Sequence, residues 1–223
     1  MKWYVIVEGR HTEKKIYRAW IGHAFPGMCR AERIEDMQDQ CYYLIIGAGY
    51  PSCLQRIADA VADIQEHLHA FDRLVICVDA EEMAAAQRRS AIEEHVSAAG
   101  CPCAYTVVVQ NCCIETWLLG HSTLMKRTPQ EPTLLEYQQF YDVRTNDPEA
   151  MPAMPPSIVR AQFHYDYVRA MFRERQLSYT KKQPGHACDR TYLEALVKRV
   201  DETSHLRSLA FLIDHWRSLG SRI

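Results

Sequence analysis

The sequence predicts an α/β protein with a mostly parallel, four-stranded sheet flanked by helices, because two hydrophobic patterns alternate along its first half. Continuous apolar runs rich in β-branched and aromatic residues cover residues 3–7, 42–46, 74–78 and 105–109. Such runs are typical of strands buried on both faces. Segments with helical apolar spacing follow each run, so the pattern indicates βαβ units. We expect a ligand to bind at the carboxyl ends of these strands.

The predicted helices of the first half have recognisable ends. The first begins near Thr12 and stops before Pro26-Gly27, a pair that cannot continue a helix. Helical spacing also covers residues 52–68 and 85–100, and it resumes at residues 114–119, after the fourth strand.

The second half differs in pattern. Residues 121–156 contain six prolines and little periodicity, which predicts a long loop or lid. Helical spacing then returns. We therefore divide the chain into a domain over residues 1–120, a loop or lid over 121–156 and a basic helical extension over 157–223. The helices expected in the extension cover residues 157–176, 190–200 and 205–219.

The formal net charge of -2 combines two unlike parts. Residues 1–159 contain 14 Lys and Arg against 21 Asp and Glu, whereas residues 160–223 contain 12 against 7. Clustered acids can hold divalent cations, and a basic region can attract phosphate backbones. Ordinary solvated helices would give similar counts. The composition, 48% hydrophobic and 24% charged, excludes a disordered chain.

Composition also guides the expected location. No apolar run approaches the ~18 residues that a membrane span requires, and the first residues lack the pattern of a signal peptide. Nine cysteines without regular spacing do not form a disulfide framework. We expect a cytoplasmic protein with reduced thiols and no membrane partner.

Acidic residues follow three of the four predicted strands. Glu8 follows the first, Asp79, Glu81 and Glu82 follow the third, and Glu115 lies just beyond the fourth. Parallel strands bring such residues to one edge, where Mg²⁺ or Mn²⁺ would offset their repulsion. The spacing of Asp79 and Glu81 would place both on one side of a continuing strand. The alternative is that these acids only stabilise helix N-termini.

Several segments together resemble the Toprim domain, the metal-binding domain of topoisomerases and primases. They are Val5–Gly9 (VIVEG), Thr12-Glu13 and Leu74–Glu81 (LVICVDAE), in that order. The chain is most similar to short bacterial stand-alone Toprim nucleases related to the overcoming-lysogenization-defect (OLD-like) family, whose opening reads V-E-G-x-T-E. Glu115–Leu118 (ETWL) resembles their E-x-W-L signature. The resemblance covers about residues 3–120 and implies a Toprim-like Rossmannoid sheet.

The resemblance implies a Toprim-type metal-dependent endonuclease that uses Mg²⁺ or Mn²⁺. Glu8, Asp79 and Glu81 would hold the first ion, and Glu13 and Glu115 would contribute to a second. Such ions activate water, orient the scissile phosphate and stabilise the leaving oxygen. Whether one ion or two bind stays open. The chain departs from the pattern by one extra residue between Glu8 and Glu13, and by Glu81 where aspartate is commoner.

Relatives of this type also use a lysine from a later segment. Lys181 and Lys182 are both candidates, and either could neutralise charge developing on a phosphate. The alternative is a solvated loop. The basic extension would grip DNA or RNA without sequence specificity, as phosphate contacts do. Its candidate residues are Arg160, Arg169, Arg173, Arg175, Arg190, Lys198 and Arg199.

The resemblance also implies a separate ABC-type ATPase partner in an anti-phage defence system. The chain itself contains no G-x-x-x-x-G-K-[ST] nucleotide motif. We expect a partner or self-association, as a homo-oligomer, to restrain the nuclease. The competing hypothesis is a catalytically inactive Toprim-like module that binds nucleic acid or a partner, which the two departures from the pattern would favour.

Four cysteines raise the question of zinc. Cys101 with Cys103 forms C-x-C, and Cys112 with Cys113 forms C-C, neither of which is the C-x₂-C knuckle. We therefore expect these cysteines to be buried as small hydrophobic residues rather than to bind metal.

Overall fold

The computed structural model describes residues 1–155 and 159–223, so the domain boundary expected at 156/157 lies outside the described residues. The predicted α/β class is confirmed: all strands are parallel, in the order β2-β3-β1-β4-β5. The short edge strand β2 was not predicted, because three residues are too few to show a pattern. The strands are β1 (Lys2–Val7), β2 (Cys29–Ala31), β3 (Cys41–Ile46), β4 (Arg73–Asp79) and β5 (Ala104–Gln110).

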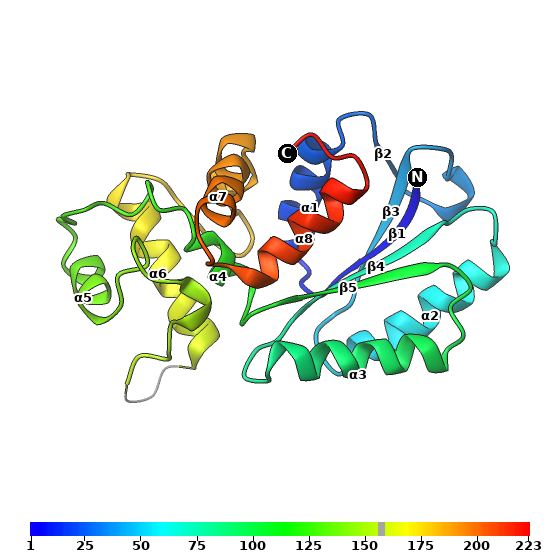
Figure 1. Cartoon of the computed structure of the whole chain (residues 1–223), viewed down its shortest axis with the longest axis horizontal. Helices are drawn as coiled ribbons and strands as arrows, with labels where there is room; N and C mark the ends of the chain where they lie inside the picture. Colours follow the sequence, from blue (N-terminus) through cyan, green and yellow to red (C-terminus); the bar gives the residue numbers. More distant parts are fainter. Residues whose placement is uncertain (156–158) are drawn as a thin grey trace.

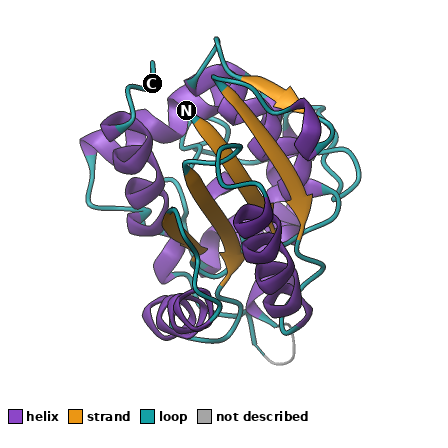
Figure 2. Ribbon diagram, turned by 90° about the vertical axis from the view of Figure 1, so that its right-hand side faces the viewer, coloured by secondary structure: helices purple, strands orange, loops and turns teal. Residues whose placement is uncertain are grey.

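Helices cover both faces of the sheet (Figures 1 and 2). None of them, over the described parts of the chain, is long and apolar enough to cross a membrane. The α-helices are α1 (Thr12–Ala24), α2 (Ser52–Glu66), α3 (Ala85–Ala98), α4 (Ile114–Leu118), α5 (Pro132–Phe140), α6 (Arg160–Glu174), α7 (Arg190–Glu202) and α8 (Arg207–Ser218). Three 3₁₀ turns are η1 (Ile34–Asp36), η2 (Pro148–Ala150) and η3 (Gly185–Cys188).

The two faces bury different sets of strand residues, because successive side chains of a strand point to opposite sides. Tyr4 and Ile6 of β1 pack in one core with α2 and α3. Val5 and Val7 belong to the opposite core, which includes α1 and the helices of the second half. In Figure 1, α2 and α3 lie together on one side of the strands, and α1 and α8 lie on the other.

The C-terminal helices share a core with the sheet. One hydrophobic cluster runs from Trp3 in β1 to Trp216 in α8. The Trp20 indole N–H in α1 donates to the main-chain carbonyl of Ala187 at 2.9 Å. The Phe25 ring meets Trp216 edge to face, with centroids 6.1 Å apart. The helical extension is therefore part of the same folded unit, and it completes one face of the sheet.

The segment expected to form a loop or lid over residues 121–156 contains regular structure in its described part, namely α5 and η2. Pro132 occupies the first turn of α5, where its missing N–H costs no hydrogen bond. The Glu131 carboxylate caps this helix by accepting the N–H of Leu134 at 2.7 Å. Tyr137 of α5 packs edge to face on Phe163 of α6, with centroids 5.1 Å apart. The segment is thus packed against the protein.

The strand order reverses direction between β1 and β4, at the carboxyl edge of the sheet. From β1 the chain builds β2 and β3 on one side, and then crosses to β4 on the other. Ligands of open parallel sheets bind at this switch point, outside the carboxyl ends of the strands. Glu8 follows β1 there, and its N–H donates to the Cys77 carbonyl of β4 at 3.0 Å. Asp79, the last residue of β4, pairs in register with Gln110 of β5.

We predict that Trp216→Ala lowers the free energy of unfolding by about 3–5 kcal/mol, because a large aromatic side chain leaves the shared core. Trp216 is 2% exposed. Phe211→Ala on the same helix is the control: Phe211 is 36% exposed, and we expect a loss below about 1 kcal/mol. Urea unfolding followed by circular dichroism and tryptophan fluorescence should show one transition. Separate unfolding of the C-terminal helices, with the sheet unchanged, would contradict the shared core.

Candidate active site at the carboxyl edge of the sheet

Glu8 joins the ends of β1 and β4. Its side chain is buried, and its two oxygens accept the main-chain N–H of Asp79 at 2.8 Å and that of Tyr50 at 3.0 Å. Burial raises the pKa of Glu8, and the negative charge of Glu81 raises it further. The two N–H donors and the Arg88 guanidinium lower this pKa, but they do not cancel the effect of burial. Glu8 is therefore held in one orientation at the switch point of the sheet.

Glu13 lies over the glycine that follows Glu8. A Cβ atom placed on Gly9 would collide with the Glu13 carboxylate, so the glycine leaves the space that this carboxylate occupies. Burial raises the pKa of Glu13 to about 7, helped by the charges of Glu115 and Glu8 and opposed by Lys181. The extra residue between Glu8 and Glu13 thus does not carry Glu13 away from the other acids.

Asp79 and Glu115 complete a group of four acidic side chains. The Oδ1 atom of Asp79 is buried and has no hydrogen-bond partner among the described residues. Burial raises the pKa of Asp79 well above its usual value, and the charges of the other acids, Glu13 foremost, raise it further. Glu115, buried in the first turn of α4, accepts a hydrogen bond from the Tyr179 hydroxyl at 3.0 Å. We call Glu8, Glu13, Asp79 and Glu115 the acid cluster.

Glu81 lies at the rim of this site. Because β4 ends at Asp79, the alternation of a strand does not continue to Glu81. Its backbone turns at a φ of 52°, its N–H donates to the Cys112 carbonyl at 2.8 Å, and its side chain is exposed. Glu82 is also exposed and accepts the main-chain N–H of Arg160 at 3.2 Å. The D-x-E spacing therefore does not bring both acids to one face of a strand.

A turn from the second half of the chain brings Lys181 to the acid cluster. The Thr12 hydroxyl donates to the Lys181 carbonyl at 2.9 Å, and the Lys15 ammonium donates to the Lys182 carbonyl at 2.6 Å. Burial lowers the pKa of Lys181, but nearby negative charges, those of the acid cluster among them, outweigh burial and raise it. The charge of Lys181 therefore interacts with the acid cluster.

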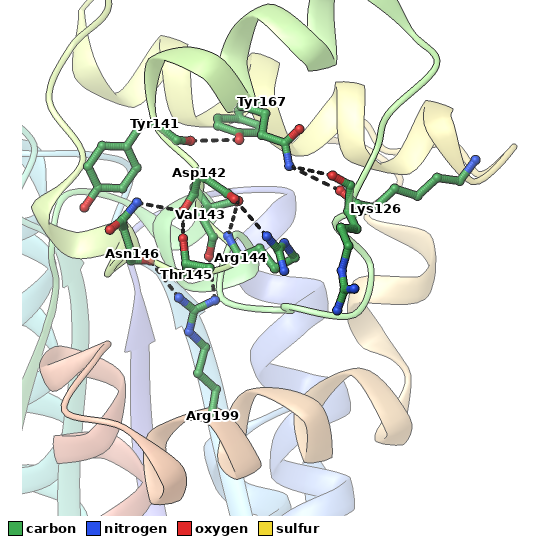
Figure 3. A network of polar contacts seen from close by, with 11 residues as sticks. Lys126, Tyr141, Asp142, Val143, Arg144, Thr145, Asn146, Tyr167 and Arg199 are labelled. Atoms are coloured by element: carbon green, nitrogen blue, oxygen red, sulfur yellow. Dashed lines mark hydrogen bonds and ion pairs between the residues drawn. The ribbon is translucent and has the colours of Figure 1, made fainter.

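The seven basic residues expected to grip phosphates are engaged within the protein. Arg199 is buried and donates to the main-chain carbonyls of Val143 and Asn146, each at 2.7 Å (Figure 3). Arg160 and Arg175 also donate to main-chain carbonyls. A role for Arg199 in contacting nucleic acid is incompatible with its burial. The other four form exposed ion pairs: Arg169 with Asp166, Arg173 with Glu131, Arg190 with Glu194 and Lys198 with Glu202.

The donor set of the acid cluster fits a hard divalent cation. Such ions take carboxylate oxygens as ligands, and a cation would satisfy the unpartnered oxygen of Asp79 and reduce the repulsion among the acids. The cluster is not fully convergent. Within the described residues, Cys112, Cys113 and His164 alone supply three ligand atoms that all lie within 4.8 Å of one another. Side-chain rotation must therefore accompany the binding of a cation by the acids.

The structure also adds residues that the sequence did not indicate. Tyr179 and Thr12 tie the Lys181 turn to the site through their hydroxyl groups. The buried Arg88 guanidinium lies 3.8 Å from the centre of the Tyr50 ring, and its charge acts on Glu8. Isolated tyrosines, threonines and arginines carry no sequence signal of such roles.

Comparison with known proteins adds no family assignment: the chain matches no protein-family model, no curated protein and no solved structure. The geometry of the acid cluster is therefore the main basis for a functional proposal.

We predict that Gly9→Ala displaces the Glu13 carboxylate, because the new Cβ atom would occupy its space; since this carboxylate ends a flexible side chain, we expect a loss of stability of about 1 kcal/mol or less. The same change should cost less in a Glu13→Ala background, since the colliding group is then absent. Gly22→Ala is the control, because nothing lies within 4 Å of its added Cβ atom, and it should stabilise α1 by about 0.5–1 kcal/mol. Equal losses from Gly9→Ala in both backgrounds, measured by urea unfolding, would argue against this contact.

We predict that the stability of the metal-free chain falls as pH rises from 4.5 to about 7, because Glu13 has its pKa raised over this interval. Between these pH values the folded state keeps a proton on Glu13 that the unfolded state has lost. Each unit rise in pH therefore lowers the free energy of unfolding by up to about 1.4 kcal/mol. Glu13→Gln should remove this part of the slope, and exposed Glu94→Gln should keep it. The measurement is urea unfolding with a chelator across this range; the same slope in wild type and Glu13→Gln would contradict the assignment.

Proposed function

We propose that this chain is a divalent-metal-dependent nuclease that hydrolyses phosphodiester bonds of DNA or RNA, with Mg²⁺ or Mn²⁺ bound at the acid cluster. One observation carries the proposal: a buried oxygen of Asp79, at the switch point of the sheet, has no partner among the residues described, and the charges of Glu8, Glu13 and Glu115 act on this residue. Buried carboxylates without cations are costly, which favours a metal as their natural counter-charge.

Each acid has a distinct part in this proposal. Asp79, with its free oxygen, and Glu8, oriented by two N–H donors, would hold the cation. The bound ion would supply an activated water and positive charge at the scissile phosphate. Glu13 can accept and release a proton near neutrality, because burial raises its pKa to about 7. It is therefore suited to be the general base, or it would join Glu115 at a second ion.

Lys181 would supply a second positive charge. Its ammonium interacts with the acids, so it lies near the place where a phosphate would meet the cation. Charge that develops on the phosphate in the transition state would be stabilised there. The hydrogen bond between Tyr179 and Glu115 positions this lysine, because Tyr179 lies two residues before it in the same turn.

The partners implied by the Toprim resemblance belong to the same proposal. The resemblance supports three further parts of this proposal: a separate ABC-type ATPase, action in anti-phage defence, and self-association. An ATPase gene next to the gene for this chain would strengthen them. The exposed basic side chains Arg169, Arg173, Arg190 and Lys198 are the remaining candidates for phosphate contacts.

We predict Mg²⁺- or Mn²⁺-dependent cleavage of DNA or RNA by the purified chain, alone or with the ATPase partner. Asp79→Asn should lower the rate at least about 100-fold, because it removes charge from the proposed metal site. Lys181→Ala should lower it about 100-fold, whereas its neighbour Lys182→Ala, the matched control, should stay near wild type. Gel assays on labelled substrates measure this. The absence of cleavage with either metal and either substrate, or full activity of Asp79→Asn, would contradict the proposal.

A Toprim-like module that binds without catalysis is the competing function. The exposed position of Glu81 and the incomplete convergence of the acid oxygens favour it. Calorimetric titration with Mn²⁺ separates the two functions, because the nuclease requires a specific site that Asp79→Asn removes. An inactive module of this kind would give the same featureless titration for both proteins.

A further inference from the structure

A second group of ligand atoms lies next to the acid cluster, and it has different chemistry. The thiols of Cys112 and Cys113 and a ring nitrogen of His164 all lie within 4.8 Å of one another. The three residues are 0%, 4% and 0% exposed. The two cysteines lie in the turn between β5 and α4, and His164 comes from α6, about fifty positions further along the chain.

Thr116 holds this group together. Its hydroxyl oxygen accepts the main-chain N–H groups of Cys112 at 3.2 Å and Cys113 at 3.3 Å, and it lies 2.7 Å from Nδ1 of His164. With two N–H groups already directed at the oxygen, the hydroxyl hydrogen is left for Nδ1. The lone pair of this nitrogen accepts that hydrogen bond, so the Thr116 hydroxyl, which lies 3.7 Å from the Cys113 sulfur, must turn away before Nδ1 can bind a metal.

The other ring nitrogen lacks a hydrogen-bond partner. Nε2 of His164 is buried and unpartnered among the described residues, although the main-chain carbonyl of Met151 interacts with the ring without meeting hydrogen-bond geometry. A metal on one nitrogen of a histidine commonly sets the other to donate to a main-chain carbonyl. A small rotation of the ring on metal binding would complete that bond to Met151.

We propose that Cys112, Cys113 and His164 form a buried site for Zn²⁺ or a similar thiophilic cation. Zinc takes sulfur at about 2.3 Å and imidazole nitrogen at about 2.0–2.1 Å, so ligand atoms within 4.8 Å need only a modest contraction to share one ion. Two thiolates and a neutral imidazole balance the charge of Zn²⁺, so the complex as a whole is neutral. Burying a neutral complex costs less free energy than burying an isolated ion.

Such a site would clamp α6 onto the turn that begins α4. Glu115 of the acid cluster lies two residues after Cys113, so the zinc site would steady the segment that carries it. Metal bound to a folded site stabilises the fold, and its thiol protons are released on binding. The zinc site is chemically separate from the oxygen-lined acid cluster, and it does not depend on the proposed nuclease activity.

The test is metal content by mass spectrometry of the full chain, purified without added metal and dialysed. We expect about one zinc per chain in wild type, and at least about a tenfold loss in Cys112→Ser/Cys113→Ser and in His164→Gln. Cys101→Ser/Cys103→Ser and Asp79→Asn are matched controls that should keep the zinc, because the two cysteines precede β5, whereas Cys112 and Cys113 follow it, and Asp79 belongs to the acid cluster.

Co²⁺ titration of the metal-depleted wild type supplies a readout that does not depend on the folding of variants. Thiolate ligation should produce an intense sulfur-to-cobalt absorption band at one equivalent, and excess Zn²⁺ should abolish it. A wild-type chain that is purified without zinc and gives no such band would overturn the proposal. Retention of zinc by the Cys112→Ser/Cys113→Ser variant would overturn it as well.

Discussion

The hydrogen bond from the Asp79 main-chain N–H to the Glu8 carboxylate joins the ends of β1 and β4, and the candidate site is arranged around it. This bond exists because the chain changes direction across the sheet between these strands, which places their carboxyl ends side by side. This hydrogen bond orients Glu8. Gly9, the next residue, has no side chain, and the Glu13 carboxylate occupies the space that a Cβ atom would fill there.

This arrangement buries carboxylates and brings like charges together, and both raise the pKa of Glu13 at a cost. The rise of the Glu13 pKa from 4.5 to about 7 corresponds to about 3 kcal/mol of less favourable ionisation. The Lys181 ammonium offsets part of that cost, and it lies in a turn after α6 whose Tyr179 hydroxyl donates to Glu115. A helix-rich second half that packs on the sheet is therefore a condition for the site, since it delivers these two groups.

Two kinds of donor atoms meet where β5 passes into α4. Glu115 belongs to an oxygen-lined group suited to hard cations, whereas Cys113, two residues earlier, belongs to a group of sulfur and nitrogen atoms. Hard and thiophilic cations would each find a preferred set of ligands here. The short turn between these elements thus contributes to both groups, and α6 closes one of them through His164.

The sequence by itself determined the α/β class, four of the five strands described, and the positions of Glu8, Asp79 and Glu115 after strand ends. Continuous apolar runs and strand ends are local properties, and parallel pairing then carries these acids to one edge. The short strand β2 and the helix α5 escaped prediction, because three residues show no period and Pro132 occupies the first turn of α5.

Only the tertiary structure showed that the charge of Lys181 interacts with the acids, and that Arg199 is buried among main-chain carbonyls. A count of charges does not distinguish one arginine from another. The five N–H donors of a guanidinium can bind the main-chain carbonyls of a loop as readily as the oxygens of a phosphate. The meeting of His164 with Cys112 and Cys113 was equally hidden, because it depends on how α6 packs against a turn about fifty residues away in the chain. Contacts of that separation are made by packing, and no local pattern records them.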